Sequence, residues 1–174
     1  MDSVIDDVNV YHARIVAGKA LAESYPVDAD LVVGVPDSGL VAAKGYSEQS
    51  GIPYGMAFHK NSYVGRTFIK PNQKEREDSV KIKLSILEPA VRGKSIVLVD
   101  DSIVRGTTMG EIVAMARSAG AKKVYVASSA PRVCFPNVYG IDMPTRSELL
   151  CGDGKGADEV ARIIGADKVV YQTI

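Results

Sequence analysis

The sequence predicts an α/β fold in which a mainly parallel sheet is flanked by helices. Short apolar runs of strand length alternate with segments of helical periodicity along the chain, as in proteins built from parallel strands and connecting helices. The run at 95–99 is continuous and rich in β-branched residues, which is typical of a strand covered on both faces. Polar turns containing glycine follow two of the runs, at 36–39 and 100–106.

In the first part of the chain, helices are predicted where apolar residues recur without an interior proline, and strands where apolar residues run together up to a turn residue. Pro53 and Gly55 indicate that the strand predicted over 52–58 lies at a sheet edge or bends. These criteria give a helix over 10–23, a strand over 31–35, a helix over 40–49 and a strand over 52–58.

Residues 59–79 form the longest predicted loop, which is polar and carries more Lys and Arg than Asp and Glu. Loops longer than about 12–15 residues in a compact domain are usually functional or disordered. A short helix is predicted over 80–91 and is expected to stop near Pro89. The remaining predicted elements are strands over 95–99, 124–128 and 168–171, and helices from Thr108 to Gly120, near 145–148 and over 157–164.

The segment after the 95–99 run carries the strongest chemical signal. Asp100 and Asp101 follow the strand directly, and the loop then reads Ser-Ile-Val-Arg-Gly-Thr-Thr. Thr108 and Glu111 match a capping box, which predicts that a helix begins where the loop ends. Loop N–H groups and the positive end of a helix favour a bound anion, whereas two carboxylates favour a divalent cation or sugar hydroxyls. Together they predict a site for a magnesium-bound sugar phosphate.

The 36–39 turn, Pro-Asp-Ser-Gly, is by itself an ordinary turn sequence. Its position after an apolar strand gives it more weight, because ligands of parallel α/β proteins bind beyond the carboxyl ends of the strands. Gly39 would allow backbone N–H groups to approach an anion closely. We therefore expect the turns after the two strands to line one cleft.

Composition narrows the class of protein. The 174 residues fit a single domain, and 21 Lys and Arg balance 21 Asp and Glu, which argues against a general nucleic-acid-binding surface. No apolar run approaches the roughly 20 residues of a membrane span, and the first residues lack a signal-peptide pattern. We expect a cytoplasmic protein. Cys134 and Cys151 are expected to be unpaired, inert thiols.

The motif at 99–108, Val-Asp-Asp-Ser-Ile-Val-Arg-Gly-Thr-Thr, resembles the phosphoribosyl-pyrophosphate (PRPP) motif of type I phosphoribosyltransferases in its amidophosphoribosyltransferase form. The resemblance extends over 35–39, 60–69 and 135–144, in the same order and spacing. It implies the type I phosphoribosyltransferase fold, a flexible lid over 59–79, and formation of 5-phosphoribosylamine and pyrophosphate from Mg²⁺-bound PRPP and ammonia. That reaction is the first step of purine biosynthesis.

The resemblance also implies roles for individual residues. Lys60 and Arg66 would stabilise the charge that develops on pyrophosphate, and Tyr63 would shield the anomeric carbon from water. Asp100, Asp101 and Ser38 would lie at the magnesium ion. The substrate-binding residues would be Asp37, Ser38, Gly39, Asp100, Asp101, Ser102, Ile103, Val104, Arg105, Gly106, Thr107 and Thr108.

The sequence departs from the family in ways that affect its partners. Family members begin with a glutaminase domain whose nucleophile is an N-terminal cysteine, whereas residue 2 here is Asp. Some members hold an iron–sulfur cluster with four cysteines, and this chain has two. We expect either a fragment or a stand-alone transferase half, acting with a separate glutaminase and assembling as a homo-oligomer.

Two other readings stay open. The first is a non-catalytic module that binds or senses PRPP, which Lys60, Tyr63 and Arg66 argue against. The second is a phospho-acceptor or phosphatase domain with acidic residues at a strand end, in which the Arg-Gly-Thr-Thr segment would have no role.

Overall fold

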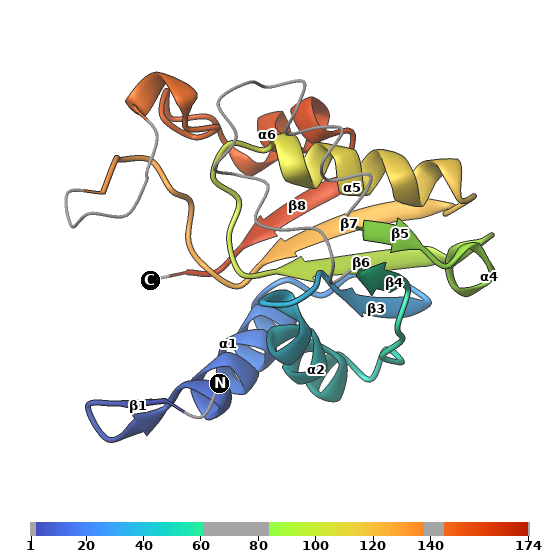
Figure 1. The fold of residues 1–174 in the computed structure, drawn as a ribbon, viewed down its shortest axis with the longest axis horizontal. Coiled ribbons are helices and arrows are strands. Elements are labelled where there is room, and N and C mark those ends of the chain that lie inside the picture. The colour runs from blue at the N-terminus through green and yellow to red at the C-terminus, as the bar shows by residue number, and fades with distance from the viewer. Residues whose placement is uncertain (1–2, 61–83, 138–144, 174) are drawn as a thin grey trace.

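A computed structural model describes residues 3–60, 84–137 and 145–173. Its centre is a parallel four-stranded sheet, in the order β3-β6-β7-β8. Helices α1 and α2 cover one face, and α5 and α6 cover the other (Figure 1). The sheet strands are β3 (Leu31–Gly34), β6 (Ser95–Asp100), β7 (Lys123–Ser128) and β8 (Lys168–Tyr171), and the helices are α1 (Val10–Ser24), α2 (Gly39–Ser50), α5 (Thr107–Ser118) and α6 (Ala157–Ile164).

The strands divide their side chains between two core clusters, because successive side chains of a strand point to opposite faces. In β6, Ile96 and Leu98 pack with the α5 and α6 side, whereas Val97 and Val99 pack with the α1 and α2 side. All four are almost completely buried. This two-sided burial explains why the run is continuously apolar rather than alternating, and it confirms the predicted parallel α/β fold.

Helices α1 and α2 approach one another closely at two glycines. A Cβ added at Gly18 would lie 2.0 Å from the carbonyl oxygen of Ala42, and one at Gly45 would lie 2.1 Å from that of Ile15. A side chain at either position would therefore have to push the helices apart. The two contacts fix how α2 lies along α1.

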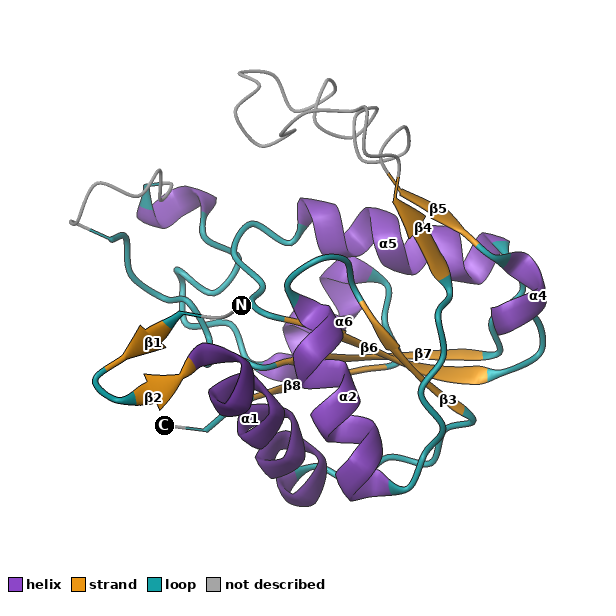
Figure 2. Ribbon diagram, turned by 60° about the horizontal axis from the view of Figure 1, so that its bottom comes forward, coloured by secondary structure: helices purple, strands orange, loops and turns teal. Residues whose placement is uncertain are grey.

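Two antiparallel hairpins lie outside the central sheet (Figure 2). The first, β1 (Val4–Ile5) with β2 (Val8–Asn9), precedes α1, is exposed throughout, and was not predicted. The second pairs β4 (Phe58–Lys60) with β5 (Leu84–Ile86). Thus His59 and Lys60, expected at the start of the long loop, belong to a strand, and residues 61–79 of that loop lie outside the described residues.

Two predicted elements were wrong. The strand expected over 52–58 is only a single parallel bridge between Tyr54 and Val32, because Pro53 lacks an N–H group and the chain turns away to β4. The helix expected over 80–91 is replaced in its described part by β5 and the short helix α4 (Glu88–Val91). Pro89 lies in the first turn of α4 and starts the helix instead of ending it.

The start of α5 also differs from the prediction. Thr107 is its first residue and Gly106 is its N-cap, so the proposed capping box of Thr108 with Glu111 was wrong. The capping box of Thr145 with Glu148 is confirmed, on the short 3₁₀ helix Arg146–Glu148. Among the described residues, no helix is long and apolar enough to cross a membrane.

Candidate active site

The turns after β3 and β6 lie against each other at the carboxyl edge of the sheet. The N–H of Val35 donates to the carbonyl oxygen of Val99 at 2.9 Å, extending the pairing of the two strands. At Gly39, an added Cβ would lie 2.2 Å from the oxygen of Val99 and 3.0 Å from Cα of Asp100. Only glycine permits this approach. The structure therefore brings together the two turns that the sequence placed in one cleft.

The paired carboxylates lie at the end of β6 in a partly enclosed environment, Asp100 as its last residue and Asp101 directly after it. Asp100 accepts a hydrogen bond from the N–H of Asp101 at 2.8 Å, and its carbonyl accepts one from Ser129 at 2.9 Å. Burial, together with repulsion from the neighbouring Asp101 carboxylate, raises the pKa of Asp100 to about 7. A cation at this position would offset both effects. The pair therefore has the electrostatics expected of a metal or polyol site.

The loop from Ser102 to Gly106 is held by the core and by the 145–152 segment. Ile103 is buried among core residues, so only its backbone is available to a ligand. The carbonyl of Val104 accepts a hydrogen bond from Leu150 N–H at 2.9 Å. Gly106 has φ +80°, and an added Cβ would lie 2.6 Å from a Leu150 methyl group. This anchoring fixes the backbone that precedes α5, and a helix N-terminus is a place that favours an anion.

Residues of the 100–108 motif differ in what their side chains can offer. Thr107 and Thr108 lie in the first turn of α5, where helix N–H groups and the helix dipole favour an anion, and Thr108 is exposed. The Nε atom of Arg105 is buried and has no hydrogen-bond partner among the described residues. Ser102 is half-buried beside Asp101.

Lys60 reaches the 36–39 turn from β4. Its ammonium group forms an ion pair with the carboxylate of Asp37, whose side chain is 68% exposed. Ser38 is the N-cap of α2, but its side chain makes no capping hydrogen bond. Lys60 is thereby placed beside the turn that is expected to bind substrate. Tyr63 and Arg66, the other two predicted catalytic residues, lie outside the described residues.

Arg14 contacts the same turn and was missed by the sequence reasoning. Its Nη1 donates to the carbonyl of Ser38 at 2.8 Å, from the second turn of α1. A single arginine in a predicted helix has the same sequence pattern whether its side chain is solvated or contacts a turn. Only the packing of α1 against α2 shows that Arg14 points to the turn.

The oxygen-rich residues at this edge fit magnesium in number and type. Asp100 and Asp101 would supply carboxylates, and Ser38, on the adjoining turn, would supply a hydroxyl. Among the described residues, no cluster of three or more His, Cys, Asp and Glu side chains is found. Magnesium is commonly held by one or two carboxylates with waters and substrate phosphates, so a pair is sufficient.

Comparison with known proteins agrees with this geometry. Residues 10–133 match the family model for the phosphoribosyl transferase domain. The chain belongs to this family. Its fold is accordingly that of the type I phosphoribosyltransferases, and the matched region contains both turns and both carboxylates.

Longer relatives share nearly the whole chain. It is 50% identical over 173 residues to an amidophosphoribosyltransferase from Methanocaldococcus jannaschii, and 49% identical to those of Staphylococcus aureus and Archaeoglobus fulgidus. In each case 99% of this chain is covered, but only 36%, 35% and 38% of the relative. The chain thus spans little more than a third of the length of these phosphoribosyltransferase relatives.

Two solved structures superimpose closely. One, described as the allosteric regulatory enzyme of purine biosynthesis, gives a TM-score of 0.86 at 50% identity and covers 99% of this chain and 37% of its own. The other is glutamine PRPP amidotransferase from B. subtilis complexed with ADP and GMP, with a TM-score of 0.87 at 49% identity, over 99% of this chain and 38% of its own.

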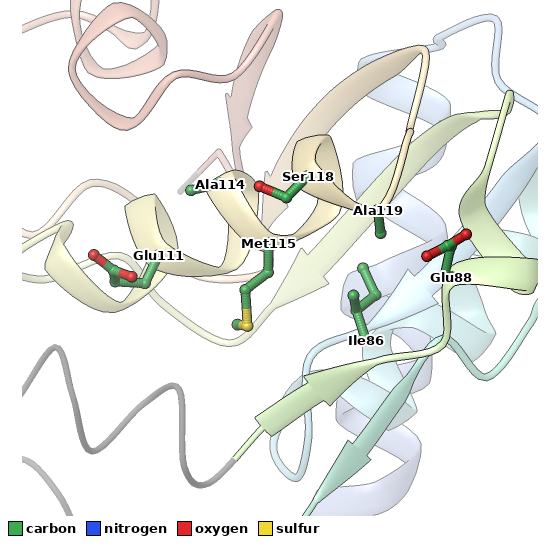
Figure 3. A pocket seen from close by; sticks show the side chains of 7 residues that line it. All are labelled: Ile86, Glu88, Glu111, Ala114, Met115, Ser118 and Ala119. Carbon is green, nitrogen blue, oxygen red and sulfur yellow. The ribbon is translucent and has the colours of Figure 1, made fainter.

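Two grooves lie away from these turns. One of about 560 Å³ lies between β5 and α5 and is lined by Ile86 and Met115, with Glu111 and Glu88 toward its opposite ends (Figure 3). The other, of about 870 Å³, follows β8 between Tyr25, Arg132 and Phe135. Neither is lined by a residue of the 36–39 or 100–108 turns.

Both cysteines are unpaired, as predicted, with Cys151 buried and Cys134 half-buried.

Proposed function

We propose that this chain is a phosphoribosyltransferase domain that binds Mg²⁺-PRPP and, with ammonia, forms 5-phosphoribosylamine and pyrophosphate. The observation that carries the proposal is the contact of Gly39 with Val99 and Asp100, which joins the proposed pyrophosphate turn to the paired carboxylates. The named activity of relatives that are 49–50% identical over nearly all of the chain supports it.

Each half of the site suits one part of PRPP. The backbone of 102–106 and the first turn of α5 suit the 5-phosphate, since helix N-termini favour anions. Asp100 and Asp101 suit the ribose hydroxyls and the metal. The 36–39 turn suits the pyrophosphate. Mg²⁺, held by these carboxylates with Ser38 nearby, would supply positive charge against the leaving pyrophosphate.

The reaction breaks the bond between the anomeric carbon and a pyrophosphate oxygen and forms a carbon–nitrogen bond to ammonia. The pyrophosphate keeps the electron pair of the broken bond, and the new ammonium group releases one proton. Because the transition state has oxocarbenium character, catalysis depends on positioning and charge stabilisation rather than covalent chemistry. Lys60 would stabilise negative charge that develops on pyrophosphate, with Tyr63 and Arg66 proposed to assist.

Binding of the ligand would redistribute the charges at the turn. Lys60 is paired with Asp37 in the structure, so an incoming pyrophosphate has to compete with that carboxylate for the ammonium group. Because Asp37 is exposed, breaking its ion pair with Lys60 costs little free energy, about 0–1 kcal/mol. Lys60 can therefore transfer from Asp37 to the ligand.

The proposal includes the source of nitrogen. We propose that a glutaminase acts as the partner of this domain and supplies the ammonia. We also propose that the domain acts as a homo-oligomer.

The purified chain provides the test. With PRPP, Mg²⁺ and an ammonium salt at alkaline pH, we expect release of pyrophosphate and no additional release when glutamine replaces ammonium. Lys60→Ala is the matched variant and should lower turnover while the protein remains folded, with Lys44→Ala on the outer side of α2 as control. Glutamine-dependent turnover by the pure chain would contradict the proposed division of labour.

The runner-up is a PRPP-binding module without catalysis. It shares the turns and the carboxylates with the enzyme, so binding alone does not separate the two. PRPP binding by calorimetry without turnover from ammonia would favour this second reading.

A further inference from the structure

Arg14 links helix α1 to the turn that the proposed function assigns to pyrophosphate. The hydrogen bond from its Nη1 to the carbonyl of Ser38 spans 24 residues of sequence at 2.8 Å, in a partly buried position. No other hydrogen bond of this guanidinium is found to a described residue. The contact is long-range and charge-assisted, and bonds of that kind are stronger than neutral ones.

Among the described residues, β4, β6 and α1 each contact the 36–39 turn, and the three contacts differ in kind. Gly39 packs on the end of β6, and Asp37 pairs with Lys60. Both Lys60 and the region beside Gly39 belong to surfaces that a ligand would use. The third contact, from Arg14, goes to a main-chain carbonyl instead. An anionic ligand would compete with Asp37 for Lys60, but the Ser38 carbonyl remains available to Arg14 in both states.

Because a peptide unit is planar, the hydrogen bond from Arg14 to the Ser38 carbonyl fixes the orientation of the whole unit. The same unit carries the N–H of Gly39, which donates to the carbonyl of Val35 at 3.0 Å. Arg14 and Val35 therefore hold this peptide from its two ends. Its orientation sets where the Ser38 hydroxyl and the first turn of α2 lie, and that hydroxyl is not used in a capping bond.

Helix α1 is a firm support for this contact. Gly18 and Gly45 place the backbones of α1 and α2 against each other, so the backbone of Arg14 cannot shift relative to α2 without disrupting that packing. The guanidinium thus belongs to α1 and donates a hydrogen bond to the N-cap residue of α2.

We infer that Arg14 is a positioning residue that holds the Ser38–Gly39 peptide in the orientation that accepts the magnesium-bound pyrophosphate group of PRPP. The inference rests on the proposed function, because it names pyrophosphate as the ligand of this turn. It assigns Arg14 no contact with the substrate and no role at the 5-phosphate loop.

The test compares two ligands that use different halves of the site. Arg14→Ala should weaken binding of Mg²⁺-pyrophosphate by about tenfold or more, as expected for loss of one charged hydrogen bond. Binding of ribose 5-phosphate should stay within about twofold, because its phosphate is expected at 102–108. Calorimetry on both ligands gives the two affinities. Arg14→Lys should recover part of the loss, since one N–H donor is enough for the carbonyl.

Lys19→Ala is the matched control. Lys19 lies on the same helix and joins α1 to α2 through Glu48, with a 3.0 Å ion pair and 42% exposure of both side chains. Its removal loses a cation and an interhelix contact without touching the turn, so both affinities should stay at the wild-type level. If Arg14→Ala does not fold, Arg14→Lys alone is compared with wild type and should show a pyrophosphate-specific loss.

The outcomes separate the two proposals. A wild-type chain that binds neither PRPP nor Mg²⁺-pyrophosphate would overturn the proposed function together with this inference. If wild type binds both and Arg14→Ala binds them equally well, only the role of Arg14 is overturned. An equal loss for both ligands, or the same loss in Lys19→Ala, would show general loosening of the helices and would also overturn it.

Discussion

Strand β6 and the segment that follows it are adjacent in sequence but differ in what determines their structure. From Ile96 to Val99 the side chains are at most 1% exposed and pack on both faces of the sheet. From Asp100, the last residue of β6, to Gly106 most residues are half-buried, and the carbonyls of Asp100 and Val104 accept hydrogen bonds from Ser129 and Leu150. The strand is stabilised by burial of apolar surface, whereas the turn retains a desolvated carboxylate, Asp100.

This difference means that the two stretches contribute differently to the stability of the protein. Apolar burial stabilises the fold directly, at roughly 25 cal/mol per Å². A carboxylate with a raised pKa at a strand end does not stabilise the ligand-free protein. The role proposed for it is to bind the ligand. Substitutions in the strand should therefore change stability, and substitutions in the turn should change affinity.

The largest effect on stability is expected in the strand. Leu98→Ala removes a completely buried side chain from the core cluster on the α5 side. It should lower the free energy of unfolding by about 2–5 kcal/mol, through lost burial and the cavity that remains. Urea denaturation measures the loss. Ile163→Ala, at a side chain that is 52% exposed, is the control. PRPP affinity of the folded fraction should be unchanged, and a selective loss of affinity would contradict the comparison.

The next effect is expected on affinity at Asp101. Asp101→Asn should weaken magnesium-dependent PRPP binding by about 10- to 150-fold, because a charged ligand contact contributes roughly 1.5–3 kcal/mol. Stability should change by less than about 0.5 kcal/mol, since the side chain lies outside the core. Calorimetry with and without Mg²⁺ tests this, with the exposed Asp153→Asn as control. Unchanged PRPP affinity in both Asp100→Asn and Asp101→Asn would remove the carboxylates from the proposed site.

Asp100 gives a prediction about pH. Its pKa is about 7 in the folded chain and near the ordinary 3.8 in the unfolded chain, so the folded state binds more protons between these values. Stability of the ligand-free protein should therefore fall as pH rises from about 4 to 7. Asp100→Asn should remove that slope and raise stability at pH 8 by about 1–3 kcal/mol.

Urea midpoints at pH 5 and pH 8 measure this effect, with Asp153→Asn again as the reference. Mg²⁺ should reduce the difference between wild type and Asp100→Asn at pH 8, because the cation favours the ionised carboxylate. A wild-type stability that rises with pH in this window, while that of Asp100→Asn follows the same course, would show that Asp100 is not the group responsible.

The smallest effect on stability is expected at Thr108. It is exposed and lies inside α5 rather than at the N-cap, so Thr108→Ala should change the unfolding free energy by less than about 0.5 kcal/mol. If its hydroxyl binds the 5-phosphate, affinity for ribose 5-phosphate should fall about tenfold. Loss of a real N-cap costs about 1 kcal/mol, so a drop of that size without an affinity change would restore the capping interpretation.

The buried strands and the glycine-terminated helices could be predicted because one physical cause dominates each. The runs of β3 and β6 are apolar because both faces are covered, and Gly51 and Gly165 end their helices with φ near +75°. The adjacency of the 36–39 and 100–106 turns also followed from sequence, because parallel strands bring their carboxyl ends to one edge.

Elements whose residues carry mixed signals could not be predicted. Pro89 is compatible with both the start and the stop of a helix, and β5 has only three residues, too few for a clear period. The hairpin at Val4–Asn9 has fully exposed strands and hence no buried face to mark it. Arg14 needed the tertiary packing of α1 on α2, which local sequence does not encode.

The glycine contacts between α1 and α2 have a consequence for motion at the site. Sliding of one helix along the other would drive the backbone at Gly18 into Ala42 and that at Gly45 into Ile15. Shear between these two helices is therefore blocked, and rearrangement at the 36–39 turn has to come from rotation of its own backbone bonds. Helices α1 and α2 thus form a rigid support, and the position of the turn is set before a ligand binds.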